Sequence, residues 1–177
     1  MSQNSNVIYS CIYGGYEDLH DPEFREPDTD YVIFTDDPDL KSDFWEIRLV
    51  PTTEGMHGAR FHKRMKCLPQ IWLSEYKTSV WLDANLRIIK PDYMEWIKEN
   101  SPSNSITLYK HFCLAERHRE CAYKELTEST HMFKYQQDLP KFLTQMEDYD
   151  NDNFPQEWGL YQTTFIYRNH ENQEDRD

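Results

Sequence analysis

The sequence has few basic residues and no long apolar run. Nineteen Lys and Arg stand against 32 Asp and Glu, a net charge of −13 at pH 7 that repels nucleic acid and anionic membranes. The first apolar run, "VIYSCIY", is too short for a membrane span or a signal-peptide core, and the preceding "MSQNSN" has no basic residue. We therefore expect a cytoplasmic protein with no transmembrane segment and no nucleic-acid partner.

Several motifs that carry chemistry elsewhere are also missing. Cys11, Cys67, Cys113 and Cys121 form no Cys-x-x-Cys pair or zinc-like spacing, so we expect reduced, partly buried thiols. The chain has no Gly-x-Gly-x-x-Gly dinucleotide fingerprint and no Gly-x-Ser-x-Gly elbow. These absences leave covalent hydrolase chemistry without support.

What is present predicts an α/β fold. The 177 residues, 38% apolar and 15% aromatic, predict a single domain over 1–177 with a polar tail at 171–177. Short β-rich runs alternate with candidate helices, which predicts a mixed central sheet with flanking helices. Strands are expected at 7–13, 31–35, 44–50, 79–83, 106–109 and 163–167, and helices near 57–74, 92–99, 116–128 and 139–149. Pro69 is expected to kink or split the first helix.

Polar residues follow three of the predicted strands, at the edge where ligands of α/β folds usually bind. In "WLDAN", Asp83 and Asn85 offer a carboxylate and an amide oxygen, hard ligands that suit Mg²⁺ or Mn²⁺, although a turn explains them equally simply. Gly14 and Gly15 follow the first strand and indicate a tight turn or a close ligand. Asp36 after the second strand fits a turn or a ribose contact.

The segment "GARFHKRMKCLPQ" is a basic island on an acidic protein. It carries Arg60, Lys63, Arg64 and Lys66 and no acidic residue. A small anionic ligand explains such an island better than a polyanion, which would meet the surrounding negative field. A solvated helix face explains it as well from charge alone.

Taken in order, six blocks of the chain resemble a known family. The blocks are "VIYSCIYGGYEDL", "DYVIFTDDP", "ARFHKRMKCLP", "VWLDANLRI", "RECAYKE" and "WGLYQTTFIYRNH". They are similar to the glycosyltransferase-like family of bacteria, phages and plants that was long described only as a domain of unknown function. The resemblance runs from about Val7 to His170, and its plant members include proteins linked to seed mucilage polysaccharide.

The resemblance implies a GT-A-type fold, a Rossmann-like nucleotide-binding sandwich with Mn²⁺ or Mg²⁺ on the diphosphate of a sugar nucleotide. It implies that Asp83, Asn85 and His170 hold the metal, and that Arg60, Lys63 and Lys66 hold the phosphates. The remaining donor-binding residues that it implies are Tyr13, Gly14, Gly15, Tyr16, Thr35 and Asp36.

Two features of this chain depart from the family. The chain ends seven residues after His170, so we expect it to lack the family's C-terminal segment. Gln162 stands where many relatives have a glutamate, which makes Glu125 the leading acid or base, with Arg119 beside it. Trp158, which follows the polar segment "DNDNFPQE", is the residue on which an acceptor sugar is expected to stack.

The resemblance to this family, together with the polar strand ends and the basic segment, predicts a metal-dependent glycosyltransferase. The expected donor is a nucleoside diphosphate sugar, with UDP favoured, and the expected acceptor is a glycan, a lipid or a surface-polymer precursor. Two other functions fit the same residues: a non-catalytic nucleotide- or glycan-binding module of GT-A type, and a metal-dependent hydrolase.

Overall fold

The computed structural model describes residues 4–52, 58–101, 106–111, 121–156 and 158–171. Its strands are β1 (Asn6–Ile12), β2 (Thr29–Thr35), β3 (Glu46–Leu49), β4 (Thr78–Leu82), β5 (Ile106–Lys110) and β6 (Tyr161–Asn169). Its α-helices are α1 (Gly58–Cys67), α2 (Tyr93–Asn100), α3 (Ala122–Thr130) and α4 (Leu139–Asn151), with 3₁₀ turns η1 (Pro69–Ile71) and η2 (Phe133–Asp138). Each predicted strand and helix is present, whereas η2 was not predicted.

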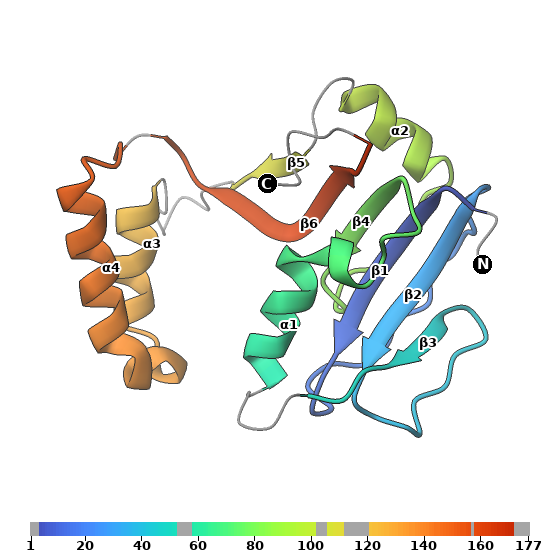
Figure 1. Cartoon of the computed structure of the whole chain (residues 1–177), viewed down its shortest axis with the longest axis horizontal. Coiled ribbons are helices and arrows are strands. Elements are labelled where there is room, and N and C mark those ends of the chain that lie inside the picture. The colour runs from blue at the N-terminus through green and yellow to red at the C-terminus, as the bar shows by residue number, and fades with distance from the viewer. Residues whose placement is uncertain (1–3, 53–57, 102–105, 112–120, 157, 172–177) are drawn as a thin grey trace. The chain divides into compact units, whose positions relative to one another are not determined.

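The strands form one mixed sheet in the order β3-β2-β1-β4-β6-β5 (Figure 1). β1 is parallel to β2 and to β4, and β2 is parallel to β3. β6 runs antiparallel to β4, with Thr78 opposite Asn169 and Leu82 opposite Phe165. The prediction of an α/β fold with a mixed sheet is confirmed.

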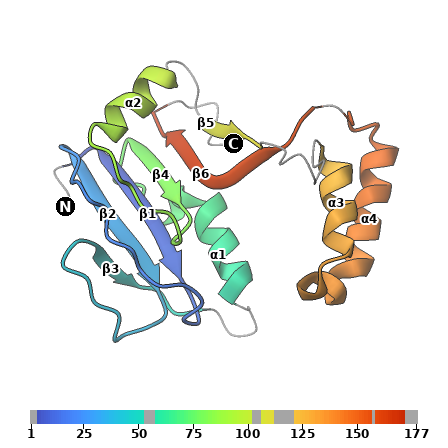
Figure 2. The same cartoon turned by 180° about the vertical axis from the view of Figure 1, so that it is seen from behind.

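Alternation along the central strands divides the core into two layers, one on each face of the sheet. Val7, Tyr9 and Cys11 of β1 point to the face covered by α1, where they pack with Phe61 and Met65. Ile8 and Ile12 point to the other face, where the apolar side of α2 packs through Met94 and Ile97. The helices are seen from both sides in Figures 1 and 2.

The helix that was predicted near 57–74 is split at Pro69, as expected. α1 ends at Cys67, and η1 begins at Pro69, because proline has no N–H to continue the helix and disfavours helical geometry at Leu68. Phe61 and Met65 are buried, whereas Leu68 is 38% exposed. Pro69 therefore turns the chain away from the helix axis.

Glu26 stabilises the start of α2 from outside the helix. The residue before α2, Asp92, is in the left-handed region (φ 57°) and makes no side-chain cap. The buried carboxylate of Glu26 instead accepts hydrogen bonds from the backbone N–H groups of Tyr93 (3.1 Å) and Met94 (3.4 Å). A tertiary contact therefore satisfies donors that a local cap satisfies in most helices.

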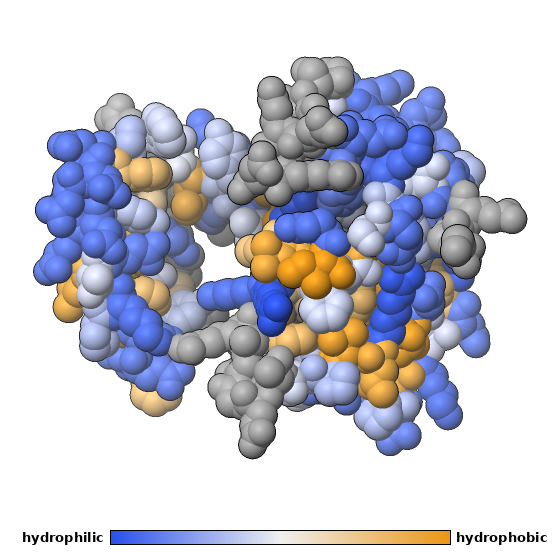
Figure 3. All heavy atoms as spheres, viewed as in Figure 1, coloured by the Kyte–Doolittle hydropathy of each residue, from blue (hydrophilic) through white to orange (hydrophobic). Residues whose placement is uncertain are grey.

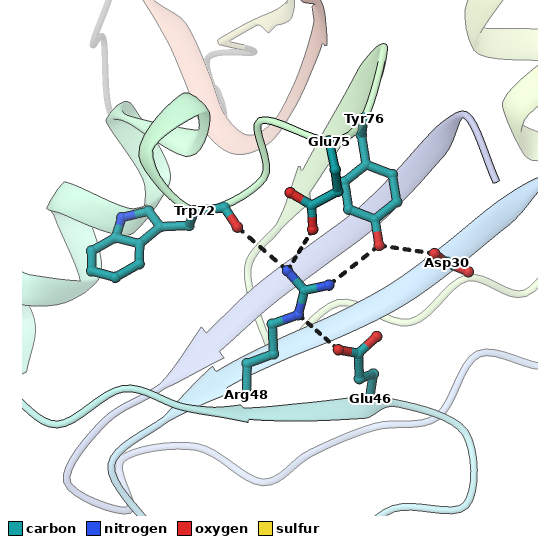
Figure 4. A network of polar contacts seen from close by, with 6 residues as sticks. All are labelled: Asp30, Glu46, Arg48, Trp72, Glu75 and Tyr76. Atoms are coloured by element: carbon teal, nitrogen blue, oxygen red, sulfur yellow. Dashed lines mark hydrogen bonds and ion pairs between the residues drawn. The ribbon is translucent and has the colours of Figure 1, made fainter. Parts of the chain in front are cut away.

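The edge strand β3 is fixed by a polar network around Arg48 (Figure 4). The Arg48 guanidinium makes ion pairs with Glu46 at 2.8 Å and with Glu75 at 2.9 Å. It also donates to the carbonyl of Trp72 at 3.3 Å and to the hydroxyl of Tyr76 at 3.4 Å. These contacts join β3 to the segment between η1 and β4.

The chain contains two compact units, and the single domain that the sequence predicts stays a prediction. The first unit comprises Met1–Leu108 and Thr164–Asp177, and the second comprises Tyr109–Thr163. In the second unit, α3 and α4 pack together with η2. The composition gave no sign of this division, because no linker-like segment separates the two units.

The visible surface is largely hydrophilic, with scattered apolar patches (Figure 3), as expected from a mean hydropathy of −0.91. Among the described residues, no helix combines the length and the apolar character that crossing a membrane requires. The described cysteines, Cys11, Cys67 and Cys121, are free, with Cys11 and Cys121 buried and Cys67 exposed. Cys113 lies outside the described residues.

Candidate functional site

The candidate site lies at the carboxyl ends of β1 and β4. From β1 the parallel strands continue through β2 to β3 on one side, while β4 lies on the other side of β1. Such a reversal of strand order opens a crevice beyond the strand ends, where α/β sheets usually bind ligands. Tyr9 pairs with Trp81, so Cys11 and Asp83 come two residues later at this edge.

Asp83 is the centre of a polar cluster on the α1 face of the sheet. Its Oδ1 accepts a hydrogen bond from Trp81 Nε1 at 2.7 Å and pairs with Lys66 Nζ at 2.8 Å. The Lys66 side chain is 10% exposed and the Asp83 side chain 21% exposed. The structure therefore brings Asp83, the predicted metal ligand, and Lys66, a predicted phosphate ligand, together as a largely buried ion pair. Removing either partner would leave the other charge buried without compensation.

Local geometry explains why these groups meet. Side chains two residues apart in a strand share a face, so the Trp81 indole and the Asp83 carboxylate lie on the same side of the sheet. Lys66 is in the last turn of α1, the helix that covers this face. Its ammonium is 5.3 Å from the centroid of the Trp81 ring, a favourable cation–π distance.

The Gly14–Gly15 turn forms the second part of the site. Both glycines have positive φ, 66° and 63°, a region that side chains with a Cβ adopt at a cost. The N–H of Gly14 donates to Asp36 Oδ1 at 3.0 Å, which joins the ends of β1 and β2. Tyr16 is 83% exposed, whereas Tyr13 is buried. The hydroxyl of Tyr13 has no hydrogen-bond partner among the described residues.

The buried side chain of Thr35 stabilises the turn that follows β2. It is fully buried, and its hydroxyl accepts a hydrogen bond from the N–H of Asp37 at 3.1 Å. Asp37 in turn accepts from the N–H of Asp39 at 2.8 Å, the pattern of an Asx turn. Thr35 and Asp36 thus both stabilise turns, and direct contact between Thr35 and a ligand would require that turn to open.

Burial and nearby charges perturb several groups around Asp83. Burial, together with the Lys66 charge, lowers the pKa of His62, whose ring packs edge-on against Trp81 at 5.1 Å. Burial and the negative charge of Asp83 raise the pKa of Glu17. The same two causes raise the pKa of the Cys11 thiol, which makes it a poor nucleophile. Such perturbed groups are typical of functional sites.

The other predicted phosphate ligands also belong to α1. Lys63 is exposed and lies one turn before Lys66, while the side chain of Arg60 is outside the described part of the helix. Arg64 is exposed as well. Lys63 and Arg64 therefore face solvent, as on a solvated helix face, whereas Lys66 turns inward to Asp83. The interpretation of the island as a site for a small anion stays a prediction.

The oxygens at the end of β4 are of the type that a divalent ion binds together with phosphate oxygens. The hydrogen bonds from Lys66 and Trp81 both go to Asp83 Oδ1. Asn85 is exposed in the turn closed by the Leu86 N–H to Asp83 carbonyl bond at 2.9 Å. Within the same described ranges, no three His, Cys, Asp or Glu side chains gather as a metal site. Mg²⁺ commonly needs only one or two protein oxygens when phosphate oxygens supply others.

The structure does not bring His170 to this site. β6 is antiparallel to β4, so His170 follows Asn169 at the edge where β4 begins. There its Nε2 is 2.9 Å from the hydroxyl of Ser79. Ser79 comes four residues before Asp83, which corresponds to about 13 Å along extended chain. The structure therefore does not support a metal site shared by His170 and Asp83. His170 instead contacts Ser79 near the start of β4.

The remaining predicted residues belong to the second unit. Glu125 is in the first turn of α3, and its N–H donates to the carbonyl of Cys121 at 3.0 Å. Arg119 lies outside the described residues. Trp158 is 69% exposed and packs edge-on against Phe154 at 5.5 Å, which in turn stacks on Tyr149.

Sequence reasoning missed three residues of the site: Trp81, His62 and Glu17. Trp81 packs in the core, and its N–H also holds Asp83. The signal was available for two of them. Trp81 lies two residues before Asp83 in a strand, and His62 lies four before Lys66 in a helix, spacings that place side chains on one face. Comparison of the chain with family models, with curated proteins and with solved structures found no match.

Proposed function

We propose that this protein is a glycosyltransferase that moves a sugar from a nucleoside diphosphate donor, with UDP favoured, to a glycan, lipid or surface-polymer acceptor. The single observation that carries the proposal is the Lys66–Asp83 pair at the switch point between β1 and β4, beside the Gly14–Gly15 turn. A carboxylate, an ammonium and a glycine turn at this edge supply the groups that a nucleoside diphosphate needs.

The proposed roles follow from the contacts of each group. Asp83 and Asn85 would hold Mn²⁺ or Mg²⁺, which when bound neutralises charge that develops on the departing diphosphate. Lys66 and the exposed Lys63 would add fixed positive charge to the same phosphates. The Gly14–Gly15 turn, fixed by Asp36, is exposed, and apart from its neighbours in the chain nothing lies within 4 Å of a Cβ built on either glycine, so a ligand could approach its backbone.

Leaving-group stabilisation would be the main catalytic contribution of this site. Groups that are fixed before the reaction stabilise developing charge without reorganising during it. The Trp81 N–H holds the Asp83 carboxylate in place, which is the kind of preorganisation that such a mechanism requires. A sheet with parallel strands and helices on both faces agrees with a GT-A-type arrangement, which remains part of the proposal.

The proposal also includes an acid or base and an acceptor platform. Glu125 is the proposed acid or base, and Arg119, six residues earlier in the sequence, is the other proposed catalytic residue. Trp158 is the proposed acceptor platform, because an exposed indole that is supported by Phe154 presents a flat apolar face with little loss of side-chain entropy.

Calorimetric titration of UDP, GDP, CDP and ADP, each with and without Mn²⁺, tests the proposal. We expect one diphosphate to bind in a metal-dependent manner and Asp83→Asn to weaken that binding at least about tenfold, since even outer-shell changes weaken metal sites that much. Asp43→Asn is the matched control, because it removes the same charge from an exposed residue. Equal binding by both variants would contradict the proposal.

The products distinguish the two other functions. Diphosphate binding without sugar transfer or donor hydrolysis over a long incubation would favour the non-catalytic module. Cleavage of a diphosphate substrate with no acceptor sugar present would favour the metal-dependent hydrolase. Transfer to an acceptor, lost in Asp83→Asn and retained in Asp43→Asn, is the result that we expect.

A further inference from the structure

The ammonium of Lys66 already pairs with the Asp83 carboxylate that the proposed metal would bind. Its Nζ is 2.8 Å from Asp83 Oδ1, and the same oxygen accepts the Trp81 N–H at 2.7 Å. The Lys66 residue is buried, with its side chain 10% exposed, so its charge has little access to water. Asp83 is therefore a carboxylate whose charge is neutralised within the protein.

A second cation at Asp83 meets an unfavourable arrangement. A divalent ion on the remaining oxygen would share one carboxylate with the Lys66 ammonium, and two like charges on one group repel strongly where water is scarce. The positive charge of Lys66 also offsets the negative charge that would attract the ion. Binding of a divalent ion alone should therefore be weak while Lys66 stays on Asp83.

An anionic ligand changes this balance. Lysine has a flexible four-carbon stem and an ammonium that pairs with any nearby anion, so a phosphate at the strand ends offers Lys66 another partner. Trp81 would keep Asp83 oriented after the lysine leaves, because its indole is buried in the core and its N–H bond to Oδ1 does not depend on Lys66.

We propose that Lys66 couples the two binding events: its ammonium competes with a divalent cation for Asp83 and yields that carboxylate when it moves to the phosphate of a nucleoside diphosphate. The competition at Asp83 stands on the contacts alone, whereas the coupling to a diphosphate rests on the proposed function. By linkage, the diphosphate then strengthens metal binding by the same factor as the metal strengthens diphosphate binding.

The first test titrates Mn²⁺ alone into the wild type, Lys66→Met and Lys63→Met, with free Mn²⁺ measured by electron paramagnetic resonance. Both variants remove one positive charge from α1, but only Lys66 contacts Asp83. We expect Lys66→Met to bind Mn²⁺ at least about fivefold more tightly than the wild type, the lower range of measured couplings, and Lys63→Met to change less. Equal effects of the two variants would overturn the competition.

The second test repeats the Mn²⁺ titration of the wild type and Lys66→Met in the presence of saturating UDP. We expect UDP to tighten Mn²⁺ binding in the wild type and to do so much less in Lys66→Met; the same gain in both proteins would overturn the coupling. If Lys66→Met does not fold, Lys66→Gln is used in its place. The glutamine amide removes the positive charge but can still donate a hydrogen bond to Asp83. Failure of UDP to bind at all would overturn the proposed function and the coupling, while the titration with Mn²⁺ alone would still decide the competition.

Discussion

The guanidinium of Arg168 donates a hydrogen bond from Nη2 to the backbone carbonyl of Lys66 at 2.8 Å. This contact joins β6 to the last turn of α1, where carbonyl groups have no partner within the helix. Nη1 also donates to the hydroxyl of Tyr9 at 3.3 Å. Arg168 thus holds the end of the helix that presents Lys66 to Asp83.

Replacing Arg168 by methionine should destabilise the protein by about 1–3 kcal/mol, because the Lys66 carbonyl and the buried Tyr9 hydroxyl lose a charged donor. Urea unfolding followed by circular dichroism measures the loss. Arg87→Met is the matched control, since Arg87 is exposed and its ion pair with Glu23 is 3.6 Å long. A loss in Arg168→Met no larger than in this control would mean that the contact contributes nothing.

Replacing Glu26 by alanine should cost about 1–2 kcal/mol of unfolding free energy, the range of a lost helix cap. The variant leaves the N–H groups of Tyr93 and Met94 without the carboxylate that accepts from them. Hydrogen exchange at α2 measures the effect locally and should rise there first. In the control Glu99→Ala, which removes an exposed carboxylate from the last turn of α2, we expect unchanged or slightly greater stability.

Stability should depend on pH through His62. Its pKa is lowered from 6.5 by burial and by Lys66, so the unfolded chain binds more protons than the folded protein between the two values. Stability therefore falls as the pH drops through 6.5 towards the lower folded pKa, and is full above 6.5. In His62→Gln we expect a smaller change in melting temperature between pH 7.5 and 5.5 than in the wild type. An equal change in the two proteins would mean that His62 does not contribute to the pH dependence of stability.

The glycine turn offers a test that separates backbone strain from ligand contact. Gly15 has φ 63° and open space around a built Cβ, so Gly15→Ala should lose about 1–2 kcal/mol through strain alone. Gly15→Asn should lose less, because asparagine tolerates this region better. If the turn contacts the nucleoside, both variants should weaken UDP binding, and the weakening should not follow their order of stability. Unchanged UDP affinity in both would limit the turn to a structural role.

Trp158→Ala should weaken binding of the oligosaccharide acceptor while leaving the melting temperature nearly unchanged, because the indole is 69% exposed. Phe133→Ala is the control, since Phe133 belongs to the same unit and is 93% exposed. Binding of both variants to immobilised glycans gives the comparison. Equal loss in the two, or none in either, would remove Trp158 as the platform.

Local sequence patterns predicted more of this protein than its charges did. The strands were predicted from short apolar, β-rich runs and the helices from the segments between them, which are local properties. Pro69 was expected to break the first helix for an equally local reason, and it does. The partner of Lys66 could not be read in this way, because Asp83 is 17 residues away and the pairing depends on how α1 packs on the sheet.

Residue type and local spacing were enough to predict the α/β character, the strand ends with their acidic and glycine residues, and the basic helix. Which of these groups meet depends on the tertiary fold. Strand order placed Asp83 beside β1, the antiparallel direction of β6 carried His170 to the opposite edge, and packing of α1 turned Lys66 inward while Lys63 stayed exposed. Those outcomes depend on contacts between segments that are distant in the chain, which local spacing does not encode.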